Sequence, residues 1–399
     1  MNKTAFHILL VLIILLASGC EKKSSAPNPW GASDESSQDS ILGLDDIISN
    51  GELIMVTMSG PDTYYEYHGS GMGFHYMLLE EFCQHEGVAL RVDICKDTME
   101  MVARVQNGEA DIIAMPFTKN YEGLEACLSE TSGNKWHWLV NQANTSLIEE
   151  LDNCITPTVL KKVTEQQSLL MTRATVKRHV YSPMLNRSKG VISKYDHLFQ
   201  RYASLPGWDW HLMAAQCYQE SCFDPQARSW AGAGGLMQIM PATADELGLP
   251  RSQIYDPEQN VAHAAKYIAL LSNKFSDIDS PTERIKFVLA SYNGGSFHVR
   301  DAMALARKNG KSPYLWDNVR FYILALQRPE FYNDPVVKNG YMRGSETADY
   351  VDRIMQRWAN YRGVKGFGAD SNKSPGMTPL APGMPAPHPS AHRKDKYNI

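Results

Sequence analysis

The fold of the C-terminal half is indicated by residues 208–244, WDWHLMAAQCYQESCFDPQARSWAGAGGLMQIMPATA. Apolar residues recur there every three or four positions, which predicts a helix over residues 209–221. Glu220 stands at the edge of this apolar stripe, near the helix end, where loss of water should raise the pKa of its carboxyl. Glycine-rich residues 231–235 predict a loop whose backbone a ligand can approach closely, and Pro241 suits the first turn of a following helix.

Similar spacing predicts that residues 190–363 form a mainly α-helical domain. Helices are expected at 195–203, 261–275, 285–292, 315–326 and 346–361. The helix over 285–292 runs into Tyr292-Asn293-Gly294-Gly295. Taken alone, Tyr292 is typical of a core aromatic and the glycines of a helix end. Together with Glu220 and Gln238 they supply an acid, amides, an aromatic hydroxyl and two glycine loops, which is a set suited to a sugar chain.

Residues 41–165 alternate between strand and helix patterns. Strands are predicted at 53–58, 89–94, 110–116 and 135–141. Helices are predicted at 76–86, 98–107, 145–151 and 158–167. Strand–helix–strand order at this spacing predicts a small α/β layer with parallel strands. Residues 166–189 are expected to be a connector with some helix.

The two ends of the chain carry signals of another kind. Residues 1–19 have Lys3, a nine-residue apolar run and then small residues, as in a secretory signal. That run is shorter than the roughly 20 residues that span a bilayer. Cys20 follows directly in a stretch that resembles a bacterial lipobox, so we expect lipidation at Cys20, with an ordinary cleaved signal as the alternative. Residues 20–40 are expected to be a flexible linker, and 364–399 a disordered, proline-rich tail.

Composition narrows the class of protein. Of the 399 residues 43% are hydrophobic, which excludes a wholly disordered chain. The net charge is −5 and no long run of Lys and Arg occurs, so we expect no nucleic-acid partner. Seven cysteines are too few for a disulfide-built scaffold, and their pairing is left open. None forms a CxxC pair and no His lies at zinc-finger spacing, so no metal site is expected.

Three ordered motifs of the helical region carry a family resemblance. They are Glu220-Ser221-x3-Pro225 continuing through Gly235-Leu236-Met237-Gln238 to Thr243-Ala244, then Ala290-Ser291-Tyr292-Asn293-x-Gly295, then Glu346-Thr347-x2-Tyr350-Val351. Together they resemble the soluble lytic transglycosylase domain, a lysozyme-like helical fold. This family cleaves the β-1,4 bond between N-acetylmuramic acid and N-acetylglucosamine in peptidoglycan without adding water.

The resemblance implies a single catalytic carboxyl and no metal or organic cofactor. Glu220 would protonate the glycosidic oxygen and then take the proton of the muramoyl 6-hydroxyl, which closes a 1,6-anhydro ring. The implied substrate-binding residues are Ser221, Met237, Gln238, Tyr292, Asn293 and Tyr350. Gln238 and Asn293 would hold acetamido groups, and Tyr292 would orient Glu220 or stabilise developing charge. Asp224 lies beside Pro225 and is expected to cap a turn.

Residues 41–165 resemble a different family. Stretches 52–56, 73–79 and 107–113, with a closing segment at 138–151, are similar to the periplasmic solute-binding proteins of amino-acid transport. Those proteins clamp a ligand between two lobes. Only about 20 residues separate 111–116 from the closing segment here, so we expect a single lobe. A docking or regulatory module is therefore favoured over a retained solute site.

The order of lipid anchor, α/β lobe and helical domain resembles that of membrane-bound lytic murein transglycosylases. The expected protein is an enzyme of the cell envelope, lipid-anchored and facing the periplasm, with the outer membrane favoured but the choice of membrane left open. Its expected partners are peptidoglycan glycan strands, the membrane through the lipid, and a regulatory ligand or protein at the α/β lobe. Two alternatives stay open: a goose-type, lysozyme-like hydrolase on the same fold, and a non-catalytic, cell-wall-binding sensor lipoprotein.

Overall fold

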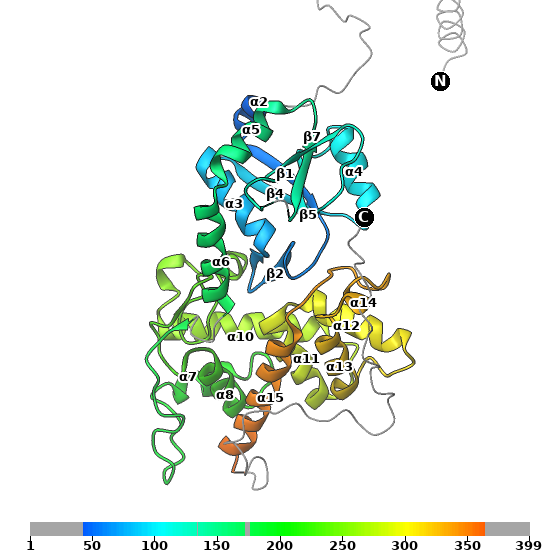
Figure 1. Ribbon diagram of the computed structural model, residues 1–399. Coiled ribbons are helices and arrows are strands. Elements are labelled where there is room, and N and C mark those ends of the chain that lie inside the picture. Colours follow the sequence, from blue (N-terminus) through cyan, green and yellow to red (C-terminus); the bar gives the residue numbers. More distant parts are fainter. Residues whose placement is uncertain (1–42, 134, 172–175, 364–399) are drawn as a thin grey trace, which may run out of the picture. The chain divides into compact units, whose positions relative to one another are not determined.

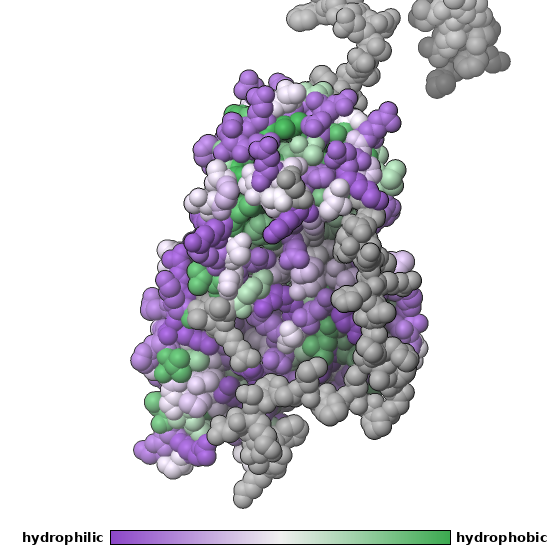
Figure 2. Space-filling model, in the orientation of Figure 1, coloured by the Kyte–Doolittle hydropathy of each residue, from purple (hydrophilic) through white to green (hydrophobic). Residues whose placement is uncertain are grey.

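The computed structural model describes residues 43–133, 135–171 and 176–363 (Figure 1). The expectations for residues 1–19, 20–40 and 364–399, including lipidation at Cys20, lie outside the described residues. Among the described residues, no helix is long and apolar enough to cross a membrane. Hydrophilic residues cover most of the face drawn in Figure 2, and hydrophobic residues are scattered over it. All six cysteines among the described residues are free thiols.

A five-stranded sheet in the order β4-β1-β5-β7-β6 organises the N-terminal region. Its strands are β1 (Glu52–Thr57), β4 (Ala89–Ile94), β5 (Ile112–Phe117), β6 (Leu124–Cys127) and β7 (His137–Asn141). Strand β1 pairs in parallel with β4 and with β5, which confirms the predicted parallel α/β layer. Strand β7 runs antiparallel to both β5 and β6. Strand β6 was not predicted, because four residues are too few for a periodic pattern to stand out.

Helices cover both faces of this sheet (Figure 1). They are α2 (Leu44–Asn50), α3 (Phe74–Glu86), α4 (Thr98–Gln106), α5 (Thr145–Cys154) and α6 (Pro157–Met171). One hydrophobic cluster holds Leu78 of α3 and Leu147 of α5, and another holds Met101 of α4. Asp97 and Asn144 begin α4 and α5 by accepting backbone N–H bonds with their side chains, as N-cap residues do. Helix α6 continues four residues past the predicted end at 167.

A β-hairpin between β1 and α3 was also not predicted. It consists of β2 (Tyr65–Tyr67) and β3 (Ser70–Met72), which pair antiparallel. His68 and Gly69 form its two-residue turn with φ of 49° and 68°. Two successive residues with positive φ match the twist of the flanking strands, and Gly69 adopts that conformation without a Cβ clash. The sequence signal for this hairpin was the pair His68-Gly69, which stands between aromatic and apolar residues.

The C-terminal region is mainly α-helical, as predicted. Its helices are α7 (Asp196–Tyr202), α8 (Trp210–Ser221), α9 (Pro241–Leu247), α10 (Pro257–Lys274), α11 (Pro281–Gly294), α12 (Ser296–Lys308), α13 (Trp316–Ala325), α14 (Pro329–Tyr332) and α15 (Gly344–Tyr361). Pro241 opens α9 as expected. A single cluster of buried side chains, including Met213, Ile268 and Val351, forms the core of the region. Two short strands, β8 (Val176–Lys177) and β9 (Arg228–Ser229), pair the connector with the loop after α8.

Candidate active site

Glu220 lies in the last turn of α8, whose end is set by local sequence. Asp209 caps the start of the helix by accepting the His211 N–H, and the chain leaves the helix at Cys222 with a left-handed φ of 51°. Glu220 there lines a cleft of about 1100 Å³. The cleft is also lined by the β2–β3 hairpin, the glycine-rich loop, the end of α11 and the start of α15. The predicted helix end therefore opens directly onto a large cavity.

The surroundings of Glu220 change the acidity of its carboxyl. Burial disfavours the charged form and raises the pKa of Glu220 to about 7. The Tyr350 hydroxyl donates a hydrogen bond to Glu220 Oε1 at 2.5 Å and partly opposes this rise. Tyr350 in turn accepts a hydrogen bond from Gln216 at 3.1 Å. A carboxyl with this pKa is protonated for about half the time at neutral pH, so it can donate a proton and take one back.

Gly235 of the glycine-rich loop packs too closely against its neighbours to carry a side chain. Gly235 has a φ of 80°, and a Cβ there would lie 2.4 Å from the Asn260 Nδ2 atom. Gln238 holds the loop, because its NH₂ group donates to the carbonyls of Ala227 and Gly235, both at 3.0 Å. The Gln238 Oε1 atom is buried and has no hydrogen-bond partner among the described residues. Gln238 lines the cleft, and its amide oxygen is an unpaired acceptor that a ligand could reach only after the side chain moves.

Tyr292 and Asn293 line the cleft at the end of α11. The Tyr292 hydroxyl donates to the Met237 carbonyl at 2.8 Å. Tyr292 was expected either to orient Glu220 or to stabilise developing charge, and in this structure the hydrogen bond to the Glu220 carboxyl comes from Tyr350. The amide oxygen of Asn293 accepts from the Thr347 hydroxyl at 2.7 Å. Tyr350, expected to bind substrate, thus acts on Glu220 directly.

Two predicted substrate contacts do not reach the cleft. Ser221 and Met237 are fully buried, and neither lines it. The Ser221 hydroxyl donates to the Cys217 carbonyl at 3.1 Å, because residues four apart share one face of a helix. Met237 contributes its carbonyl to Tyr292 from inside the core. Asp224, as expected, caps a turn and accepts the backbone N–H groups of His179 and Gln226.

A second carboxyl in the cleft, Glu346, was not assigned from the sequence although it begins the third motif. Its oxygens accept from the Tyr67 hydroxyl at 2.5 Å and lie 3.1 Å from His68 Nε2. Burial by itself would raise the pKa of Glu346, but the bonds from His68 and Tyr67 outweigh burial and lower it. The Arg343 guanidinium lies 4.7 Å from the Tyr67 ring centre. The α/β region therefore supplies part of the cleft wall, which no motif had indicated.

Comparisons with known proteins find similarity over the region that contains Glu220 and its neighbours. Residues 197–315 match the family described as the transglycosylase SLT domain, a range that includes Glu220, Gln238 and Tyr292. The chain is 40% identical over 164 residues to membrane-bound lytic murein transglycosylase F of Desulfosudis oleivorans, which covers 41% of this chain and 35% of that protein. It is 33% identical over 278 residues to the protein of the same name from Shewanella woodyi, covering 65% of this chain and 55% of that one.

A solved structure resembles part of the chain as well. Domain 1 of TmArgBP in its arginine-bound form is 19% identical, with a TM-score of 0.25, over 30% of this chain and 99% of that one. The chain spans 35–55% of the two curated relatives named above. Residues 197–315 are thus similar to transglycosylase SLT domains, and the chain is similar to membrane-bound lytic murein transglycosylase F over part of that protein's length.

Proposed function

We propose that this chain is a lytic transglycosylase that cleaves peptidoglycan glycan strands between N-acetylmuramic acid and N-acetylglucosamine. The observation that carries the proposal is the carboxyl of Glu220, which lines a large cleft and has a pKa raised to about 7 by burial. The similarity to transglycosylase SLT domains over 197–315 supports the same chemistry. Peptidoglycan is the substrate class that this similarity suggests.

Glu220 acts first as an acid in this proposal. Its proton passes to the glycosidic oxygen as the bond from that oxygen to the anomeric carbon breaks. The muramoyl 6-hydroxyl oxygen then bonds to the anomeric carbon, and its proton returns to the Glu220 carboxylate. A 1,6-anhydro end forms, no water is consumed, and Glu220 is protonated for the next cycle. A pKa near neutrality suits a group that donates and accepts in turn. Tyr350 stabilises the carboxylate through its hydroxyl.

Recognition of acetamido groups is proposed for Gln238 and Asn293. The Oε1 atom of Gln238 is unpaired, and a small movement of the side chain would let it accept the N–H of an acetamido group. The amide oxygen of Asn293 already accepts the hydrogen bond from Thr347, so its NH₂ group is left to donate to an acetamido carbonyl. Tyr292 is held against Met237 beside them and presents its ring to the sugar.

We propose that the α/β lobe is a docking or regulatory module. We also propose that Cys20 carries a lipid anchor in the cell envelope, in keeping with the relatives' description as membrane-bound.

The alternative that this chain is a hydrolase is supported by one observation, the second carboxyl in the cleft. Hydrolysis commonly pairs an acid with a second carboxylate that attacks or activates water. Glu346 is the candidate, but both its oxygens are engaged by Tyr67 and His68. A carboxylate held in this way is a poor base for water. We therefore favour the one-carboxyl, non-hydrolytic reaction.

Mass spectrometry of the soluble products tests the proposal. The full chain is incubated with purified sacculi, and the muropeptide ends are identified. We expect 1,6-anhydromuramoyl ends. Products with reducing ends would identify a hydrolase, and binding of sacculi without any release would identify a non-catalytic binding protein.

A further inference from the structure

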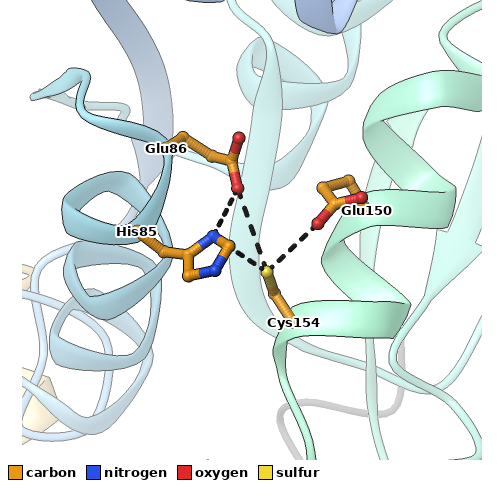
Figure 3. A group of neighbouring side chains, drawn as sticks. All are labelled: His85, Glu86, Glu150 and Cys154. Atoms are coloured by element: carbon orange, nitrogen blue, oxygen red, sulfur yellow. Dashed lines mark hydrogen bonds and ion pairs between the residues drawn. The ribbon is translucent and has the colours of Figure 1, made fainter.

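Four metal-ligating side chains meet in the α/β region. They are His85, Glu86, Glu150 and Cys154, and their possible ligand atoms all lie within 4.8 Å of one another (Figure 3). None of the four lines the cleft that contains Glu220. The cluster therefore has no part in the proposed reaction, and its chemistry needs an explanation of its own.

The secondary structure brings these residues together from two distant stretches of sequence. His85 and Glu86 form the end of α3, and Glu150 and Cys154 lie one turn apart at the end of α5. Residues four apart share a helix face, so Glu150 and Cys154 point the same way. Figure 3 shows that these two side chains face the end of α3. Two pairs of ligands therefore converge from two packed elements.

Two of the distances between ligand atoms match a small tetrahedral site, and two others lie near that range. Ligands bound to zinc at roughly 2.0–2.3 Å stand about 3.3–3.8 Å from one another. The Cys154 sulfur lies 3.3 Å from His85 Nδ1 and 3.3 Å from Glu150 Oε1. It lies 3.9 Å from Glu86 Oε1, which is 2.7 Å from His85 Nδ1. All four ligand atoms lie within 4.8 Å of one another, so side-chain adjustments alone would have to bring them to zinc-ligand spacing.

The local charge favours a cation. Two carboxylates stand at the C-terminal ends of two helices, where the helix dipoles are negative. Among the described residues, neither Glu86 nor Glu150 lies within ion-pair distance of a lysine or an arginine. The side chain of His85 is 67% exposed, so an ion can reach the cluster from solvent. A divalent ion would balance two carboxylates of which Glu86 has only the His85 imidazole at ion-pair distance.

We propose that His85, Glu86, Glu150 and Cys154 form a binding site for a single Zn²⁺ ion. One thiolate, one imidazole and two carboxylates are a mixed sulfur, nitrogen and oxygen set, which suits zinc and excludes Ca²⁺ and Mg²⁺ as good fits. The ion replaces the thiol proton of Cys154, which is released to solvent. It ties the end of α3 to the end of α5 and stabilises the α/β region, independently of catalysis.

Metal titration of the full chain tests this site. The chain is reduced, stripped with a chelator and titrated with ZnCl₂ alone against a chromogenic zinc indicator. We expect one zinc per chain that excess Ca²⁺ and Mg²⁺ do not displace. Titration with Co²⁺ should produce a thiolate-to-cobalt charge-transfer band in the near ultraviolet. Zinc should also raise the thermal unfolding temperature.

Single substitutions assign the ligands. Cys154→Ser should abolish the cobalt thiolate band, and Cys154→Ser, His85→Gln and Glu150→Gln should each weaken zinc binding about 10-fold or more. The matched controls are Cys95→Ser, His197→Gln and Glu149→Gln, which change the same residue types outside the cluster and should bind zinc as the unchanged chain does. Far-ultraviolet circular dichroism and muropeptide release show that each variant is folded.

Three results would overturn the proposal. One is a folded, unchanged chain that binds no zinc above the level of the Cys154→Ser variant. Another is zinc affinity that survives Cys154→Ser and His85→Gln together. The third is a cobalt band that disappears in Cys95→Ser but remains in Cys154→Ser. None of these results bears on the transglycosylase proposal, which rests on other residues.

Discussion

Two helix ends line the same cleft, and each carries a glutamate whose pKa is shifted in the opposite direction from the other. At the end of α8, burial raises the pKa of Glu220 to about 7, with one neutral hydroxyl as its partner. At the start of α15, hydrogen bonds from His68 and Tyr67 overcome burial and lower the pKa of Glu346. The two side chains are chemically identical. Their surroundings raise the pKa of the first and lower the pKa of the second.

Removing the acid from the α8 side should have the largest effect. Glu220→Gln keeps the shape of the side chain but leaves no proton to donate, so we expect muropeptide release to fall roughly 1000-fold or more. Binding to sacculi should remain, since the cleft wall is unchanged. Turnover by mass spectrometry and co-sedimentation with sacculi measure the two properties. Glu258→Gln, on the surface outside the cleft, is the matched control; release that survives Glu220→Gln contradicts the assignment.

The same substitution should reveal the cost of burying that carboxyl. The folded-state pKa of Glu220 is raised from 4.5 to about 7, so its contribution to folding is fully present below pH 4.5 and is lost as pH rises to about 7. Glu220→Gln does not ionise. Its stability relative to the unchanged chain should therefore be greater at pH 8 than at pH 5, by about 1–3 kcal/mol in denaturant titrations. An equal difference at both pH values would show that Glu220 is not buried in the folded chain.

Removing the Tyr350 hydroxyl, the hydrogen-bond partner of Glu220, should have the next largest effect. Tyr350→Phe deletes the bond that favours the Glu220 carboxylate, so the pKa of Glu220 should rise further. Release should fall about 10-fold, and the basic limb of the pH–rate profile should move to higher pH. Tyr322→Phe changes another buried tyrosine outside the cleft and should leave the profile in place. A loss of rate with an unmoved basic limb would indicate a packing role for Tyr350.

Neutralising Glu346, at the start of α15, should have the smallest effect on release. The negative charge of Glu346 contributes to the raised pKa of Glu220, so Glu346→Gln should lower that pKa and move the basic limb to lower pH. We expect release within about threefold of the unchanged chain at acidic pH, because Glu346 carries no proton in the proposed reaction. A loss as large as that of Glu220→Gln would instead assign Glu346 a catalytic role and favour the hydrolase.

Much of the helical region was predictable because its signals are local. The spacing of apolar residues along 208–221 placed Glu220 at a helix end, and the shift of its pKa followed from that placement. The same spacing could have excluded Ser221, since it lies four residues after the buried Cys217 and shares its face. The spacing did not show that the hydroxyl reaching the Glu220 carboxyl is that of Tyr350, because this contact joins two different helices.

The sequence alone therefore determined two kinds of region, a helical domain with an acid at one helix end and an α/β lobe before it. Only the tertiary structure decided what surrounds each reactive group. Tyr350 reaches Glu220 from 130 residues away, and Tyr67 and His68 of the α/β hairpin reach Glu346 from almost 280 residues away. His85 and Cys154, 69 residues apart, meet without any metal-binding spacing in the sequence. Periodicity reports which face of one element is buried, whereas pKa values and ligand sets depend on contacts between elements, which periodicity does not encode.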